Sequence, residues 1–231
     1  MFYNHGFVQT SFSFEVDIKT NRLAAQAKTV SGHSLMRKLF PLFILFLFCS
    51  CSSISLEEDP IVQEHFSETE IASLDSILTY FDTEVINQTP NTEVFSSYNE
   101  LFQIVKDSVE TGSLITIELD DQNLEALFIQ MPDSFQQEIW STGYSYNSHT
   151  GDSIFVRDIN PDGKYAAFLK SSSEKNDYLI QYYEGLKNAE GISPGMNTNM
   201  LLSPEELDMN KERERLIYAT HFITLRKSSA H

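Results

Sequence analysis

A run of ten almost wholly apolar residues, 39–48, is the feature that most limits what the first part of this chain can form. Two basic residues, Arg37 and Lys38, come just before the run, and the small residue Ser50 comes just after it. A helix needs about 20 apolar residues to cross the roughly 30 Å of hydrocarbon in a bilayer. The run is therefore too short to span a membrane, whereas a basic start, a short apolar middle and a small residue at the end are the parts of a secretory signal peptide.

The end of this run, Phe48-Cys49-Ser50-Cys51, resembles the lipobox of bacterial lipoproteins, and the resemblance covers residues 36–51. In that family a cysteine becomes the lipid-modified first residue of the mature chain. Cys51 follows a small residue, whereas Cys49 follows the bulky Phe48, so the resemblance favours Cys51 as the lipidation site. It implies a protein anchored by several acyl chains, such as palmitate, in a bacterial cell envelope. Two or more chains anchor stably, whereas a single chain binds only marginally.

These signals divide the chain into four segments. We interpret Met36 as the initiator, so that residues 1–35 are a start-site artefact; the alternative is a cytoplasmic arm before an uncleaved anchor. Residues 36–50 are then the signal peptide. Residues 51–64 are expected to be an acidic tether, because small, polar and acidic residues make a poor core. Residues 65–231 are expected to form one domain of ordinary size.

The segment from Cys51 onwards is strongly acidic, with 11 Lys and Arg against 31 Asp and Glu and a net charge of −20. This charge argues against nucleic-acid binding, which depends on Lys and Arg at phosphates. It makes cationic ligands or an envelope protein the natural partners; the alternative is that the acidity only keeps the protein soluble. Cleavage before Cys51 would also leave no thiol for disulfides or nucleophilic catalysis.

The resemblance also bears on location. Ser52 differs from the aspartate that often retains lipoproteins at the inner membrane, and the acidic run after it resembles the surface-export signals of some lipoproteins. The first feature implies a protein anchored by lipid at the outer membrane. The second implies exposure at the surface, and the alternative is that the acidic run is only a solvated spacer.

The clearest helix of the domain is predicted to begin after Ser67. Ser67 and Glu70 have the spacing of a capping box, in which the side chain of each residue bonds to the backbone of the other. Asp75 and Asp82 fall off the apolar stripe that follows. The stripe has helical spacing and consists of Ile71, Leu74, Ile77, Leu78, Phe81 and Val85.

Similar start and stop signals predict the remaining helices. A second helix, capped by Ser97, ends at Gly112. Its apolar face would be Leu101, Ile104, Val105 and Val109. We then expect a helix ending near Met131 and a short one from Ser134 through Trp140. Further helices should begin at Asp162-Gly163, at Asn176 and, after a break at residues 191–195, at Ser203-Pro204. A last helix is expected over residues 211–226, and its inner face would consist of Ile217, Thr220, His221, Thr224 and Leu225.

Residues 141–160 are rich in Gly, Ser, Asn and Tyr and are expected to be irregular, with one short strand at residues 154–156. Taken together, the patterns predict a mainly α fold. It would be a single-domain bundle of about six or seven helices, with room for one short strand or hairpin.

One local motif suggests calcium. In the stretch 158–163, Asp158, Asn160 and Asp162 place oxygen-bearing side chains at alternate positions before a glycine, as in the first half of a calcium-binding loop. The twelfth position, which should be a bidentate Glu, is Leu169. These residues are therefore weak calcium candidates, and the alternative is a turn followed by a helix start. No other metal site and no cofactor is predicted.

No catalytic pattern stands out, so the catalytic residues remain unknown. The histidines after Cys51 are scattered, and the chain has no His-Glu-x-x-His, Gly-x-Ser-x-Gly or Gly-rich phosphate loop. The sequence therefore favours a lipid-anchored binding or interaction protein of the cell envelope, with unknown specificity, over an enzyme. The alternative is an envelope hydrolase assembled from distant positions, for which His149, His221 and nearby acids are the candidates.

Overall fold

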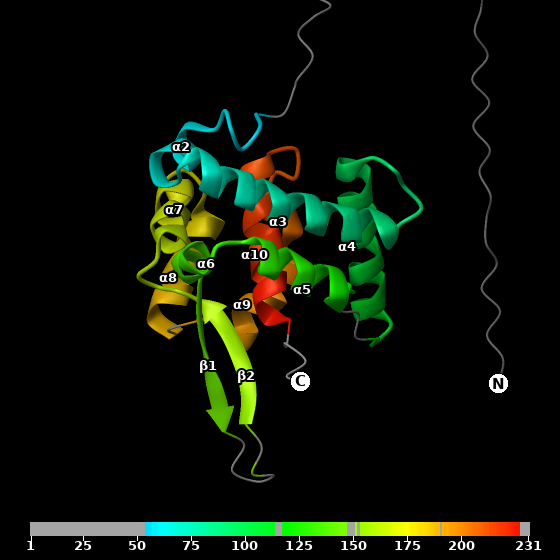
Figure 1. Ribbon diagram of the computed structural model, residues 1–231. Coiled ribbons are helices and arrows are strands. Elements are labelled where there is room, and N and C mark those ends of the chain that lie inside the picture. The colour runs from blue at the N-terminus through cyan, green and yellow to red at the C-terminus, as the bar shows by residue number, and fades with distance from the viewer. Residues whose placement is uncertain (1–53, 114–116, 147–150, 152, 190, 227–231) are drawn as a thin grey trace, which may run out of the picture. The chain divides into compact units, whose positions relative to one another are not determined.

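The computed structural model describes residues 54–113, 117–146, 151, 153–189 and 191–226. Cys51, His149 and the signal-like segment lie outside the described residues. Within those residues the chain forms nine α-helices, one short 3-10 helix and one two-stranded antiparallel sheet (Figure 1). The prediction of a mainly α domain is confirmed. No helix among the described residues is long and apolar enough to cross a bilayer.

Two long helices, α3 (Glu68–Asn87) and α10 (Glu212–Leu225), pack against each other at the centre of the fold. The capping box of α3 is formed, with the Ser67 N–H donating to Glu70 Oε2 at 2.8 Å, and every residue of the predicted stripe is buried. All residues of α10 from Glu214 to Thr224 are buried, so this helix has no solvent-facing side. Leu225, expected on the inner face, is exposed.

Helix α4 (Val94–Glu110) begins three residues before the predicted cap, and Ser97 is buried inside it. It packs on α3 through Tyr98, Leu101 and Val105. Val109, also expected inside, is 50 % exposed because this side of α4 borders a groove. The prediction for α4 was therefore right about the helix and wrong about its start and part of its face.

The remaining helices largely follow the predicted signals. Asn176 caps its helix, with Oδ1 accepting hydrogen bonds from the N–H groups of Tyr178 (3.0 Å) and Leu179 (3.2 Å). The segment expected as a plain break instead contains a helix start, at which Ser193 Oγ accepts from the Met196 N–H (3.3 Å). These elements are α5 (Asp121–Gln130), α6 (Asp133–Ile139), α7 (Lys164–Ser173), α8 (Asp177–Ala189), α9 (Pro194–Leu202) and the 3-10 helix η1 (Pro204–Glu206).

The acidic segment expected as a tether is part of the folded domain from Leu56 onwards. Leu56 is 1 % exposed, and its N–H donates to Glu212 Oε2 of α10 at 2.9 Å. Helix α2 (Pro60–His65) follows; its cap Asp59 accepts an ion-paired hydrogen bond from Arg213 Nη1 at 2.9 Å. Composition suggested a solvated spacer, but here one acidic side chain meets a basic residue of α10.

The segment expected to be irregular is a β-hairpin. Strand β1 (Trp140–Tyr146) pairs antiparallel with β2 (Ser153–Ile159), with Trp140 opposite Ile159 and Thr142 opposite Arg157. The hairpin extends away from the helices, with its base against α10 (Figure 1). The predicted strand at 154–156 lies within β2, whereas β1 was missed because its Ser and Gly residues hid the alternation of Trp140, Thr142 and Tyr144.

Candidate functional site

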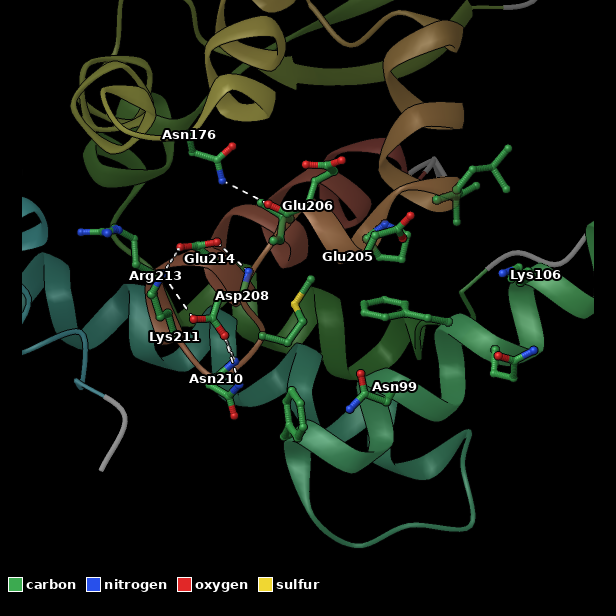
Figure 2. A pocket seen from close by; sticks show the side chains of 18 of the residues that line it. Asn99, Lys106, Asn176, Glu205, Glu206, Asp208, Asn210, Lys211, Arg213 and Glu214 are labelled. Carbon is green, nitrogen blue, oxygen red and sulfur yellow. Dashed lines mark hydrogen bonds and ion pairs between the residues drawn. The ribbon is translucent and has the colours of Figure 1, made fainter. Parts of the chain in front are cut away.

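An open groove of about 1090 Å³ runs along one side of α4 (Figure 2). Five α4 residues that line it are spaced alternately by four and three positions, which places them on one face of the helix. The outermost two, Phe95 and Val109, are 44 % and 50 % exposed. From end to end the face is Phe95, Asn99, Phe102, Lys106 and Val109.

The opposite wall of the groove is built by the end of α9, by η1 and by the segment leading into α10. Its base is apolar, with Pro204, Leu207 and Met209 all buried, and Leu202 is 45 % exposed at the edge. Contiguous apolar side chains that stay accessible beside polar ones are typical of interaction sites. The groove thus combines an apolar floor with partly exposed aromatic and aliphatic edges.

The rim of the groove is charged. Lys106 and Lys175 are exposed, as are Glu205 and Glu206 of η1, and none of the four forms an ion pair with another described residue. Burial, together with the negative charges of Glu206 and Glu205, raises the pKa of the nearby Tyr178 to about 12. The η1 edge is therefore a negative part of the rim whose carboxylates are free to meet a cation.

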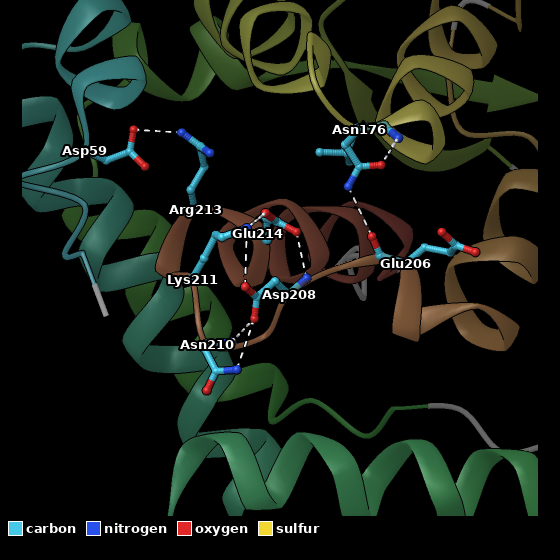
Figure 3. A network of polar contacts seen from close by, with 9 residues as sticks. Asp59, Asn176, Glu206, Asp208, Asn210, Lys211, Arg213 and Glu214 are labelled. Carbon is cyan, nitrogen blue, oxygen red and sulfur yellow. Dashed lines mark hydrogen bonds and ion pairs between the residues drawn. The ribbon is translucent and has the colours of Figure 1, made fainter. Parts of the chain in front are cut away.

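The charges at the start of α10, by contrast, satisfy one another (Figure 3). Lys211 Nζ lies 3.0 Å from Glu214 Oε1 and 3.3 Å from Asp208 Oδ2, and the Asp208 N–H donates to Glu214 Oε2 at 2.7 Å. The hydrogen bond with Glu214 raises the pKa of Lys211 more than burial lowers it. Burial alone would raise the pKa of Asp208, but hydrogen bonds from Asn210 and Lys211 lower it overall. This network therefore fixes the wall of the groove.

Two polar atoms near the groove remain without a partner among the described residues. Ser172 Oγ and Arg213 Nε are both buried and hydrogen-bonded to nothing that the structure describes. Both residues line the groove. Buried polar groups in folded proteins usually have a partner, so this is a place where a bound molecule or ordered water would find hydrogen bonds.

No family model, no curated protein and no solved structure matches this chain. Its function is therefore argued from the geometry of its own residues.

Two of the three calcium candidates, Asp158 and Asn160, use their side chains to bond to the backbone. Asp158 Oδ1 accepts from the N–H groups of Ile159 (2.8 Å) and Ile192 (2.9 Å). Asn160 bonds to the Gln137 carbonyl (2.7 Å) and to the Asp162 N–H (3.1 Å). Within the described residues no group of three or more His, Cys, Asp or Glu could hold a metal ion. These side chains thus hold the turn before α7 and the loop before α9.

His221, a candidate of the hydrolase alternative, lies in the core and does not line the groove. Its Nδ1 is 2.9 Å from Tyr182 Oη, and its Nε2 is 3.4 Å from Asn197 Oδ1. Burial lowers the pKa of His221 to about 3, so the ring is neutral at physiological pH. None of its hydrogen bonds, within the described residues, reaches a carboxylate or serine.

Sequence reasoning missed the residues of the groove. It assigned α4 a single inner face, although Phe95 and Phe102 begin a second face with alternating spacing. Leu202 carried no signal of its own, because its exposure depends on how α9 meets η1. The alternating spacing from Phe95 to Val109 could have indicated a helix with two apolar sides.

Proposed function

We propose that this chain is a lipid-anchored binding protein of the bacterial cell envelope whose groove along α4 receives an amphipathic helical segment of a partner protein. The observation that carries the proposal is a groove in which exposed apolar side chains of α4 and α9 lie among polar and charged ones. The anchor rests on the resemblance of the segment around Cys51 to a lipobox. Neither part requires catalytic chemistry.

A helix fits the groove better than an extended strand. The lining face of α4 covers 15 residues, Phe95 to Val109, and its ends are about 21 Å apart at a rise of 1.5 Å per residue. Side chains spaced by four and three form the ridges that pack against another helix. Recognition of this kind anchors apolar residues of the incoming helix in a groove.

The η1 edge of the rim favours a partner helix with basic residues along the side that meets it. Glu205 and Glu206 are exposed and lack ion pairs with described residues, and the whole chain has a net charge of −17. Complementary charge increases the rate of encounter and selects the partner more than it adds affinity. Apolar contacts with Phe95, Phe102 and Leu202 would supply most of the binding free energy.

The proposed anchor would keep this site near the membrane. Leu56, the first buried residue that the structure describes, lies five positions after Cys51. Whatever its conformation, that stretch reaches at most about 18 Å. An envelope protein with a membrane-adjacent helix is therefore the partner that the proposal favours.

Peptide binding tests the groove. The probes are an 18-residue fluorescent amphipathic Leu/Lys helix, the same helix with Glu in place of Lys, and a scrambled Leu/Lys peptide. The detergent-solubilised full chain should bind the Leu/Lys helix most tightly. The double variant F95S/V109S should weaken binding at least tenfold, whereas Ile129→Ser, at a 78 % exposed position on α5, should not. Equal affinity for the scrambled peptide, or equal affinity of the two variants, would reject the groove.

Intact mass tests the anchor separately. Protein extracted from membranes should have the mass of residues 51–231 plus acyl chains, and Cys51→Ala should abolish that species. An unmodified chain that retains the residues before Cys51 would reject the anchor and leave the groove result standing.

A further inference from the structure

A second, smaller cleft lies at the base of the hairpin, and it is independent of the groove. It has a volume of about 150 Å³ and is bordered by α6 and by both strands. All of the residues that line it are polar except a tryptophan: they are Asp133, Gln136, Gln137, Trp140, Thr142 and Arg157. Their mixture of one cation, one acid, two amides and a hydroxyl is suited to a small polar ligand.

Arg157 is the unusual member of this set. Its guanidinium carbon lies 3.6 Å from the centre of the Phe128 ring and 5.7 Å from that of Trp140. It forms no ion pair with any described residue. Burial lowers the pKa of Arg157 to about 10, and no neighbouring acid counteracts this effect. Among the described residues, Arg157 is therefore a partly desolvated cation that is ion-paired with no carboxylate, although Asp133 borders the same cleft.

The aromatic contact explains only part of this arrangement. A ring over the guanidinium interacts with its face, whereas the N–H groups point outward in the plane and need acceptors. Thr142 lies directly opposite Arg157 in the hairpin register, and the amides of Gln136 and Gln137 border the same cleft. Of these, Gln136 Nε2 is already used, since it donates to the carbonyls of Phe128 (2.8 Å) and Met131 (3.1 Å).

We propose that this cleft binds the carboxylate of a residue-sized polar ligand, which accepts hydrogen bonds from the edge of the Arg157 guanidinium. Arg and carboxylate match as two parallel hydrogen bonds. A single cation compensates a single negative charge, and Asp133 borders the same cleft, so a carboxylate fits better than a doubly charged phosphate. The amides and Thr142 would bond to hydroxyl or amide groups on the rest of the ligand.

The chain carries its own reporter for this site. Trp140 is its single tryptophan and lines the cleft, so its emission should change when the cleft fills. We would titrate the detergent-solubilised full chain with N-acetylglycine and with glucuronate, which stand for a peptide carboxylate and a sugar carboxylate. Their neutral controls are N-acetylglycinamide and glucose. Calorimetry on the same samples measures each dissociation constant without relying on fluorescence.

The expected result is saturable binding of at least one carboxylate and none of its neutral control; the carboxylate that binds identifies the ligand class. Arg157→Gln should abolish binding and Arg157→Lys should weaken it at least tenfold, because Lys cannot form the paired bonds. Lys187→Gln removes the same charge from the exposed face of α8 and should leave the dissociation constant within twofold.

A further variant guards against loss of fold. Asp133→Asn removes a negative charge at the cleft and should tighten carboxylate binding severalfold, which a damaged protein cannot mimic. Equal affinity for carboxylate and neutral control, unchanged affinity in Arg157→Gln, weaker binding in Asp133→Asn, or no saturable binding of either carboxylate would overturn the proposal. None of these outcomes bears on the peptide groove.

Discussion

Two arginines in this domain are partly or wholly removed from water, and the protein treats them differently. Arg215 on α10 is 8 % exposed and has partners on several sides: Asp82 Oδ2 at 3.2 Å from Nε, the Met209 carbonyl at 3.0 Å from Nη1 and Glu212 Oε1 at 3.9 Å from Nη2. Tyr98 Oη donates to the other Asp82 oxygen at 2.8 Å. Arg157 on the hairpin has aromatic rings beside it but no acidic partner among the described residues.

The difference distinguishes a charge that stabilises the fold from one that is available to bind a ligand. Burial raises the pKa of Asp82, and Arg215 and Tyr98 counter that effect, so the carboxylate and guanidinium depend on each other. Removing one partner of such a pair leaves an uncompensated buried charge. Arg157 has no such dependence, and this is why we assign it to ligand binding and Arg215 to the stability of the α3–α4–α10 core. The following variants test that assignment.

Asp82→Ala should have the largest effect, because it removes the closer, buried acid of Arg215 and leaves only Glu212 Oε1, 3.9 Å from Nη2. We expect the free energy of unfolding to fall by about 3–5 kcal/mol. Urea unfolding followed by circular dichroism measures it. Asp75→Ala on the same helix is the matched control, since Asp75 is exposed and has no ion pair with a described residue; it should change stability by about 0.5 kcal/mol or less. Similar losses in both variants would contradict the structural role of Arg215.

Thr224→Val tests the hydrogen bond that connects the base of the hairpin to helix α10. Trp140 Nε1 at the base of the hairpin donates to Thr224 Oγ1 of α10 at 2.8 Å, and both groups are buried. Valine has the same shape but leaves the indole N–H without its acceptor, which should cost about 1–3 kcal/mol. Trp140 emission during urea unfolding reports the change at the hairpin. Thr198→Val, at an exposed position on α9, should have little effect on the free energy of unfolding. Equal losses of stability in the two variants would show that the hydrogen bond from Trp140 to Thr224 contributes no specific stabilisation.

His221 gives the stability of the core a pH dependence. Its folded pKa is about 3 because it is buried, whereas the unfolded value is near 6.5. The unfolded chain therefore binds a proton in this window and the folded chain does not, so stability is full above pH 6.5 and falls as the pH drops toward 3. Between pH 6.5 and pH 5 the loss should be about 1.5 kcal/mol. His221→Gln should flatten this slope, and the slope of Asp75→Ala should match that of the original chain. An unchanged slope in His221→Gln would mean that His221 binds its proton equally well in the folded and unfolded chain.

The sequence predicted the helical class and α3 because a capping box and a regular stripe are local signals. It placed Asp82 off the apolar stripe, yet Asp82 is 8 % exposed, because its partners Tyr98 and Arg215 lie 16 and 133 residues away. For the same reason Arg157 carried no signal: its importance depends on Phe128 from α5 and on the register of the two strands. The groove needed α4 to meet α9 and η1, which no local pattern specifies. The features that the sequence did not predict are those that depend on contacts between residues far apart in the chain.

Arg157→Gln should have the smallest effect on stability, and the comparison with Arg215→Gln is the sharpest test of the assignment. The variant loses a cation–aromatic contact worth about 0.5–2 kcal/mol, but it also removes an uncompensated charge from a partly desolvated place. We expect the free energy of unfolding to change by no more than about 1 kcal/mol, whereas Arg215→Gln should cost about 3 kcal/mol or more because it strands Asp82.

A bound ligand should make the original chain more stable than Arg157→Gln, although the two are expected to have similar stability without it. A molecule that binds only the folded state raises stability in proportion to the logarithm of its concentration over Kd. The carboxylate that binds the hairpin cleft should therefore raise the melting temperature of the original chain and of Asp75→Ala alike, and leave that of Arg157→Gln unchanged. If Arg157→Gln instead proved as destabilising as Arg215→Gln, the guanidinium would be a structural element of the hairpin base and the cleft would need another explanation.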